Sequence, residues 1–438
     1  MTIEYTEVRI PVGELQLGMH VIRLDRPWVE TDFLLQGFII DEAQIIDALV
    51  SQCDHVYIEG RSIPEVEYSK HSISGSLNKA KGMITERDLT KEITNKSQQT
   101  MPSKAPQGNN KISYINKIST EKALPSAKHA YSSAKITVKN IMDGIRIGRM
   151  VDMNQARETV DQVVEGILQN KDALAWLTKI KNKDEYTAEH SLNVSILSAT
   201  FARYLGHNET EIKEIALCGL LHDVGKAKVP NEILNKEGRF TKEEAEIMMM
   251  HTVHGRNLLM SMPNKDLSSI DVAHSHHERI DGRGYPRRLE ASQIPYFAKI
   301  IAIVDAYDAI TSSRCYDKGR ASMEALDIIY KCKGTQFDTE LALEFIKCIG
   351  VYPPGSIVEL KTGEVGIVIE INEDNKLKPR ILLVLDRGKK EISQKIINLN
   401  SNIKDEQGNT MMIAKELTNG SYGVWLEKYL KQGFLLSK

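Results

Sequence analysis

Residues 217–226, LCGLLHDVGK, indicate both the class of fold and the kind of chemistry. The apolar run predicts a buried helix that ends at His222 and Asp223. Gly225 is typical of a helix terminator, and Lys226 follows in a loop from which it can reach the same cavity. An imidazole beside a carboxylate can hold or bridge divalent cations. Alone, however, such a pair is more often a capped helix end. The choice between a metal site and a capped helix end therefore depends on other residues of the chain.

Other histidines and an aspartate occupy inward positions of the neighbouring predicted helices. His190 shares a helical stripe with Val194 and Leu197. Asp305 lies in the apolar run FAKIIAIVDAYDAI, where an unpaired carboxylate would be costly. Any one of these could be an ordinary core residue, but helical bundles build metal sites from side chains that face one another. The set predicts a metal-dependent hydrolase, with the candidate ligands His190, His222, Asp223, His251, His276, His277 and Asp305.

Composition and hydrophobic period divide the 438 residues into four segments. Residues 1–66 contain short β-rich runs and one helix, which predicts a small α/β domain. Residues 67–135 are rich in Ser, Lys, Asn, Gln and Pro, as in a flexible linker. Residues 136–350 show helical spacing and predict an all-α catalytic domain, and residues 351–438 predict a mostly-β extension with a terminal helix. The fold class is therefore multidomain, with an all-α bundle as its core.

Charge and cysteine usage exclude several classes of partner. The formal net charge is −2, so no global basic field exists to collect a nucleic acid polymer or a membrane surface. The five cysteines are scattered without a CxxC pair, which suits a reducing compartment. No apolar run approaches the ~18 residues of a transmembrane helix. We expect a soluble, cytoplasmic protein with no membrane span.

Two blocks, HDVGK (222–226) and HHERIDGRGYP (276–286), resemble the HD-GYP family, a branch of the HD phosphohydrolases. The first 60 residues look like the small N-terminal domain that often precedes this module, and YPPGSIVELKTGEVGIV (352–368) is similar to the tail that often follows it. The resemblance covers about residues 184–346 and implies an HD-type helical bundle. Three further blocks support it: YTAEHS (186–191), HTVHG (251–255) and VDAYDAITSSR (304–314).

The resemblance implies hydrolysis of the bacterial second messenger cyclic di-GMP to linear pGpG, or onward to GMP. A hydroxide that bridges two divalent metal ions would attack phosphorus in line. By motif position, Lys226 would neutralise a phosphoryl oxygen or assist the 3′ leaving group, and Glu278 and Asp308 are candidates to orient imidazoles. One ion would be held by His190, His222, Asp223 and Asp305, and the other by His251, His276 and His277, with Asp223 bridging.

Substrate contacts are predicted on two loops. Gly284 and Tyr285 in the GYP loop either line the site, complete a tight turn, or offer a surface to a protein partner. Arg314 and Lys318 match positions where the family often has basic residues for substrate phosphates. Neighbouring residues depart from the family pattern there, so a solvated loop explains these two residues equally well.

The residue one turn before His190 bears on the number of metal ions. Tyr186 stands where members with a third metal carry a glutamate, so two ions are expected. The ligand set favours iron or manganese, and cobalt or nickel also suit it.

Two functions compete with the cyclic di-GMP phosphodiesterase. One is a catalytically weak module that binds cyclic di-GMP or a protein partner, through the GYP loop or the N-terminal domain. The other is a phosphohydrolase for another nucleotide. The intact HD, HHE and GYP blocks favour the cyclic di-GMP phosphodiesterase.

Overall fold

The structure is a computed structural model that describes residues 6–17, 19–26, 38–40, 43–60, 106, 111–180, 186–312, 320–405 and 407–432. The chain forms two compact units, Met1–Asn95 and Lys96–Lys438, and each is described by itself. Among the described residues, no helix has both the length and the apolar character that a membrane span requires.

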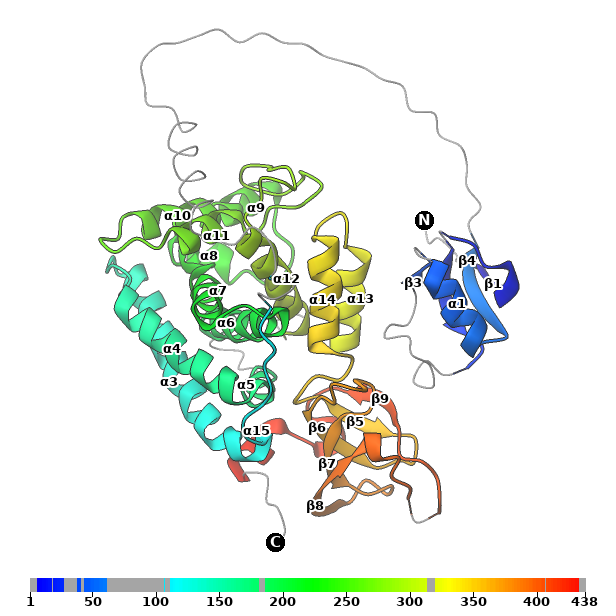
Figure 1. The fold of residues 1–438 in the computed structure, drawn as a ribbon. Helices are drawn as coiled ribbons and strands as arrows, with labels where there is room; N and C mark the ends of the chain where they lie inside the picture. Colours follow the sequence, from blue (N-terminus) through cyan, green and yellow to red (C-terminus); the bar gives the residue numbers. More distant parts are fainter. Residues whose placement is uncertain are drawn as a thin grey trace, which may run out of the picture. The chain divides into compact units, whose positions relative to one another are not determined.

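The N-terminal unit contains a small antiparallel sheet and one helix (Figure 1). Its strand order is β1-β4-β2-β3, so β4 pairs with both β1 and β2. Side chains from the strands and from the helix, including Val21, Leu49 and Val56, are buried and form its core. This arrangement confirms the predicted small α/β domain. The bounds are β1 (Thr6–Pro11), η1 (Val12–Glu14), β2 (His20–Leu24), β3 (Phe38–Ile39), α1 (Ala43–Gln52) and β4 (His55–Gly60).

The first described helix of the second unit is α3 (Thr120–Arg146), and it crosses the boundary at residue 135 that we predicted between the linker and the catalytic domain. Buried residues recur at helical spacing along its first half: Ala123, Ala127, Tyr131 and Ala134. Small alanines give this stripe little hydrophobic contrast, although alanine is the best helix former. The segment therefore resembles a linker in composition while it forms a packed helix.

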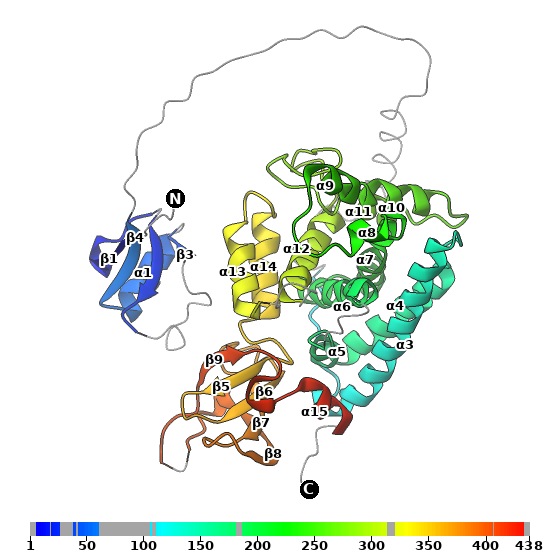
Figure 2. The same ribbon diagram turned by 180° about the vertical axis from the view of Figure 1, so that it is seen from behind.

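The core of the second unit is an all-α bundle, as predicted. Helices α6 and α7 pack against each other in its middle, with α3–α5 on one side and α10–α12 on the other (Figures 1 and 2). Both central helices are buried at most of their residues. The bounds are α4 (Met153–Gln169), α5 (Lys171–Leu177), α6 (Tyr186–Leu205), α7 (Glu209–Leu221), η5 (Val224–Lys228), α8 (Asn231–Leu234), α9 (Lys242–Met249), α10 (His251–Met260), α11 (Leu267–Ser275), α12 (Tyr296–Thr311), α13 (Ser322–Lys331) and α14 (Thr339–Ile349).

A five-stranded antiparallel sheet follows, in the order β8-β7-β6-β5-β9, and confirms the mostly-β extension. Polar contacts join it to the start of α3: Arg380 Nη2 lies 2.7 Å from Glu121 Oε1, and the hydroxyl of Thr120 donates to Glu370. The final helix returns to α3, where Lys128 Nζ donates to Leu430 O. The bounds are β5 (Ile357–Leu360), β6 (Val365–Glu370), β7 (Arg380–Leu385), β8 (Glu391–Asn398), η6 (Leu399–Ser401), β9 (Ile413–Leu417), η7 (Ser421–Gly423) and α15 (Leu426–Gln432).

Candidate metal centre

The seven predicted ligands come together where several helices of the bundle end. His190 is the fifth residue of α6, His222 caps the C-terminus of α7, and His251 is the first residue of α10. Asp305 projects from the middle of α12. Their donor atoms form three overlapping groups, each within 4.8 Å: His251, His276 and His277; His190, His222 and Asp305; and His222, Asp223 and His276. Such clusters of imidazole and carboxylate can hold metal ions.

Asp223 lies between two of these groups and turns one carboxylate oxygen towards each. Oδ1 is 3.4 Å from His251 Nε2 and 3.7 Å from His276 Nε2. Oδ2 is 3.2 Å from His222 Nε2 and 3.7 Å from His190 Nε2. This is the position that a carboxylate needs in order to bridge two cations.

The ring orientation of four histidines is set by hydrogen bonds at Nδ1. His222 Nδ1 contacts Gly219 O at 2.7 Å, His251 Nδ1 contacts Met248 O at 2.7 Å, and His276 Nδ1 contacts Val272 O at 3.1 Å. Because a carbonyl can only accept, each of these nitrogens carries the proton. The fourth histidine, His190, places its Nδ1 2.8 Å from Asp308 Oδ2. In every case Nε2 is left as the lone-pair donor that faces the cluster.

The charge state of the cluster suits metal binding. Burial lowers the pKa of His251 to about 3 and that of His277 to about 4, so both rings are neutral near neutral pH. Burial alone would raise the pKa of Asp223, but its polar and charged neighbours, among them the Lys226 ammonium, hold it well below its ordinary value. Neutral imidazoles around an ionised carboxylate are the protonation states in which these groups ligate metals.

Two buried polar atoms in the cluster need a further partner. Among the described residues, His222 Nε2 and Asp223 Oδ1 form no hydrogen bond, although both side chains are almost fully buried. A buried acceptor left unsatisfied costs about 1–3 kcal/mol. Both atoms point towards the other ligands, so a cation placed among them would satisfy them. The residues present therefore fit a metal centre.

Lys226 lies beside this centre without joining it. Its Nζ donates to Asp223 Oδ2 at 2.5 Å, and its side chain remains 22% exposed. An ammonium held in this way can meet an anionic substrate from the solvent side.

Comparisons with known proteins agree with this geometry. A family model described as an HD domain matches residues 163–341, a domain of unknown function matches residues 7–156, and a KOW domain associated with HD domains matches residues 357–422. A cyclic di-GMP phosphodiesterase of Pseudomonas aeruginosa is 33% identical over 393 residues, which is 89% of this chain and 88% of that protein. The chain belongs to the HD-GYP family.

Other relatives of this HD-GYP protein match a smaller part of the chain. A cyclic di-GMP phosphodiesterase of Thermotoga maritima is 37% identical over 38% of this chain and 45% of that protein. A 3′3′-cGAMP-specific phosphodiesterase of Vibrio cholerae is 34% identical over 36% of each chain. A relative that matches nearly the whole chain is thus named for cyclic di-GMP.

The GYP loop folds back onto the second group of histidines. Tyr285 stacks on His277, with ring centroids 4.7 Å apart and an angle of 29° between the planes. Burial raises the pKa of the Tyr285 hydroxyl, so the phenol stays protonated. Gly284 is buried against the backbone of Glu278 and Arg279, where an added Cβ would lie 2.5 Å from Glu278 Cα. Gly284 therefore has a packing role, whereas Tyr285 covers a predicted ligand.

The structure gives Glu278 a different partner from the imidazole that we predicted. Its carboxylate accepts from the backbone N–H groups of Arg287 and Leu289, at 2.7 and 3.0 Å. Glu278 thus ties down the backbone just after the GYP sequence. Asp308 does contact an imidazole, that of His190.

Three further residues, one in the loop and two on α11, escaped sequence reasoning. Arg287 Nη2 donates to Asp271 Oδ1 at 3.1 Å and to Ser275 Oγ at 2.5 Å, and so ties the loop to α11. The one sequence feature that could have predicted these contacts is the spacing of Asp271 and Ser275, which lie four residues apart on one helix face. The predicted phosphate contacts Arg314 and Lys318 lie outside the described residues.

Gly225 also has a role other than the predicted one. It is absent from the glycines with positive φ, so it does not terminate a helix in the left-handed conformation. Instead, its α-carbon faces the backbone of α10, where a Cβ would lie 1.9 Å from His251 O and 2.4 Å from Gly255 N. The absence of a side chain lets η5 and α10 approach closely, which brings Asp223 and His251 together.

Proposed function

We propose that this protein is a metal-dependent phosphodiesterase that hydrolyses cyclic di-GMP to linear pGpG, or onward to GMP. The observation that carries the proposal is Asp223, whose two oxygens face separate groups of imidazoles. The Pseudomonas relative, which shares nearly the whole length of the chain, supports cyclic di-GMP over 3′3′-cGAMP as the substrate.

The ligands divide into two sets that would hold two divalent ions, with iron or manganese favoured over cobalt or nickel. His190, His222 and Asp305 form one set, and a second comprises His251, His276 and His277. Asp223 belongs to both. Bound ions of this kind supply a Lewis acid for the phosphoryl oxygens and lower the pKa of water to near neutrality.

The chain's own groups then position the substrate. Water adds to phosphorus in line with the P–O3′ bond, which breaks, and the 3′ oxygen leaves with a proton. Lys226 stabilises the negative charge that develops on a phosphoryl oxygen or on the leaving oxygen. Tyr285 keeps the His277 ring in place and excludes water from that side. Arg314 and Lys318 would contact the phosphates from the connection between α12 and α13.

A hydrolysis assay on the purified protein tests the proposed activity. Protein prepared without oxygen is loaded with iron, manganese, cobalt or nickel and incubated with cyclic di-GMP, with 3′3′-cGAMP as the competing substrate, and products are separated by chromatography. We expect pGpG or GMP from cyclic di-GMP. Absence of hydrolysis with every metal would refute the enzyme, and faster hydrolysis of 3′3′-cGAMP would refute the substrate.

A variant tests the site itself. Replacement of the HD pair, His222→Ala with Asp223→Ala, removes the shared ligand and should abolish both metal retention and hydrolysis. A double variant as active as the parent would overturn the assignment of the centre. We also propose that protein partners bind at the GYP loop or at the N-terminal domain. A pull-down that compares the parent with the Tyr285→Ala variant tests whether a partner binds the GYP loop.

A further inference from the structure

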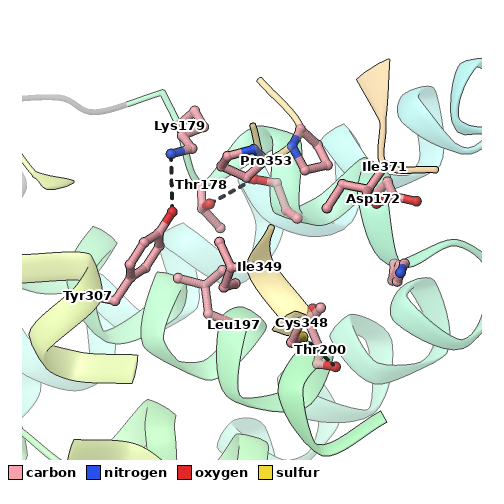
Figure 3. Close-up of a pocket in the computed structure, with 13 residues that line it drawn as sticks. Asp172, Thr178, Lys179, Leu197, Thr200, Tyr307, Cys348, Ile349, Pro353 and Ile371 are labelled. Carbon is pink, nitrogen blue, oxygen red and sulfur yellow. Dashed lines mark hydrogen bonds between the residues drawn. The ribbon is translucent and has the colours of Figure 1, made fainter. Parts of the chain in front are cut away.

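The C-terminal sheet meets the helical core at a small pocket (Figure 3). Its volume is about 30 Å³, far below the roughly 300–1,000 Å³ of a pocket for a small molecule. Lys179 on its wall already has protein partners, because its Nζ donates to Ser322 Oγ at 2.5 Å and lies 3.5 Å from the Tyr307 hydroxyl. The backbone N–H of Ser322 in turn donates at 3.0 Å to Glu416 Oε2 of the sheet, which caps α13. The pocket thus has no room for a nucleotide and serves as a joint between the two parts.

His277 is held in the metal centre by other rings instead of by a hydrogen bond. The other four histidines of the centre are each fixed at Nδ1, but among the described residues the ring of His277 forms no hydrogen bond. It packs on His276, with ring centroids 4.1 Å apart, and edge-on against His251 at 5.1 Å. Tyr285 adds a ring from outside this set, stacked on His277 at 4.7 Å. The orientation of His277 therefore depends on where the Tyr285 ring lies.

The loop that carries Tyr285 leaves α11 at its C-terminal end and is tied back to the same helix. Two predicted ligands directly follow Ser275, the last residue of α11. Arg287, two residues after Tyr285, donates from Nη2 to Asp271 Oδ1 at 3.1 Å and to Ser275 Oγ at 2.5 Å. The Ser275 hydroxyl donates to Asp271 O at 2.6 Å, so it turns a lone pair towards Arg287. Residues 276–287 thus form a closed loop whose ends meet at the Arg287–Asp271 pair.

The Arg287–Asp271 pair is shielded from solvent. The two side chains are 19% and 6% exposed, so their charge-assisted hydrogen bond lies where water competes little for it. A second pair, Arg157–Asp266, lies at the N-terminal end of the same helix at 2.8 Å, but there the arginine is 48% exposed. Exposed ion pairs contribute little to structure. The buried pair can therefore hold the loop, and the exposed pair provides a reference for it.

We propose that Arg287 and Asp271 are positioning residues for the metal ion of the second set of ligands. By tying the GYP loop to α11, they keep the Tyr285 ring on His277, which has a ring nitrogen within 4.8 Å of the donor nitrogens of the other two histidines in its set. The inference rests on the proposed function, since it assumes an ion at this set. The described contacts of the pair lie within α11 and the loop, so the ion at the first set should bind as before.

The test measures manganese binding by Arg287→Met and by a matched control, Arg157→Met. Metal-free protein is titrated with Mn²⁺, and the free ion is followed by its electron paramagnetic resonance signal. The parent should bind two ions per chain. Arg287→Met should bind one of them with parental affinity and the other about ten- to a hundredfold more weakly, the range for groups that orient a metal ligand. The control should match the parent for both ions.

Further variants test whether the pair acts through the Tyr285 ring and His277. In a His277→Ala background, Arg287→Met should cause no additional loss of affinity, because the ligand on which the pair acts is already gone. Tyr285→Phe keeps the ring and should bind both ions as the parent does, whereas Tyr285→Leu should reproduce the effect of Arg287→Met. A general loss of structure would not follow this pattern.

A double variant keeps the proposal testable if Arg287→Met folds poorly. Asp271→Leu combined with Arg287→Met leaves no unpaired buried charge and should show the same loss of affinity for one ion. Parental affinity for both ions in these variants, or an undiminished effect of Arg287→Met in the His277→Ala background, would overturn the role. A parent that binds fewer than two ions would instead refute the proposed two-ion centre and, with it, this role.

Discussion

The close approach of η5 to α10 gives a sharp prediction for Gly225→Ala. The new Cβ would lie 1.9 Å from His251 O, whereas ordinary contacts begin at 3.4 Å, so the two backbones must separate by about 1.5 Å. Asp223 and His251 lie on opposite sides of this contact, with Asp223 Oδ1 3.4 Å from His251 Nε2. Because a displacement of about 1 Å at a reacting centre can cost a hundredfold in rate, we expect kcat/KM to fall by about 100-fold or more. Overpacking should also reduce stability by about 1–3 kcal/mol.

The facing glycine supplies the control. A Cβ on Gly255 would meet Gly225 N at 3.4 Å and Ala273 Cβ at 3.5 Å, which are ordinary contacts. Gly255→Ala should therefore keep its activity within about threefold and gain up to about 1 kcal/mol from helix propensity. Hydrolysis of cyclic di-GMP, metal content and thermal unfolding of the two variants provide the comparison. Equal effects of the two substitutions would refute the close-approach argument.

Three further predictions concern charge and metal. Asp308→Asn removes a charged partner of His190 and should weaken metal binding by about ten- to a hundredfold, measured by competition with a chelating dye; parental affinity would contradict this. Asp172 is 3% exposed, and burial raises its pKa from 3.8 to about 6, so its ionised form costs the folded state roughly 3 kcal/mol at neutral pH. Since the folded state holds the proton more tightly, its stability falls as pH rises through this window; Asp172→Asn should raise the unfolding temperature at pH 7.5 and have no effect below pH 4. Removal of metal by a chelator should lower the unfolding temperature, and manganese or iron should restore activity where magnesium does not, because imidazole is a poor magnesium ligand.

Most of the candidate site was predictable because its ligands occur in short motifs with fixed local geometry. The pair His222-Asp223 follows an apolar helix, and its position at the helix end is local information. The partners of Glu278 and Asp308 were less predictable. Asp308 lies three residues after Asp305 on one helix face, so a shared neighbour could be inferred. Glu278 bonds to the backbone of a loop that folds back onto it, and this depends on a path that sequence spacing does not encode.

Some parts of the fold were hidden for a similar reason. The start of α3 looked like a linker because alanine contributes helix propensity with little hydrophobicity. The role of Gly225 could not be separated from that of a terminator, since both need a residue without a side chain. The cap that Glu416 places on α13 joins residues 94 positions apart in the sequence. Contacts of this range become visible only when the packing of the domains is known.

The geometry of the centre combines local and long-range causes in different histidines. His222 and His276 donate Nδ1–H to carbonyls in the last turn of their own helices. Local sequence thus fixes which nitrogen faces the cluster. The distances between the rings depend instead on how the helices pack, above all on the contact at Gly225. A substitution at a helix end should therefore change metal affinity, because it changes the orientation of an imidazole ring. A substitution at a packing contact should instead separate the two halves of the centre. It should reduce catalysis more than it reduces metal binding at either half.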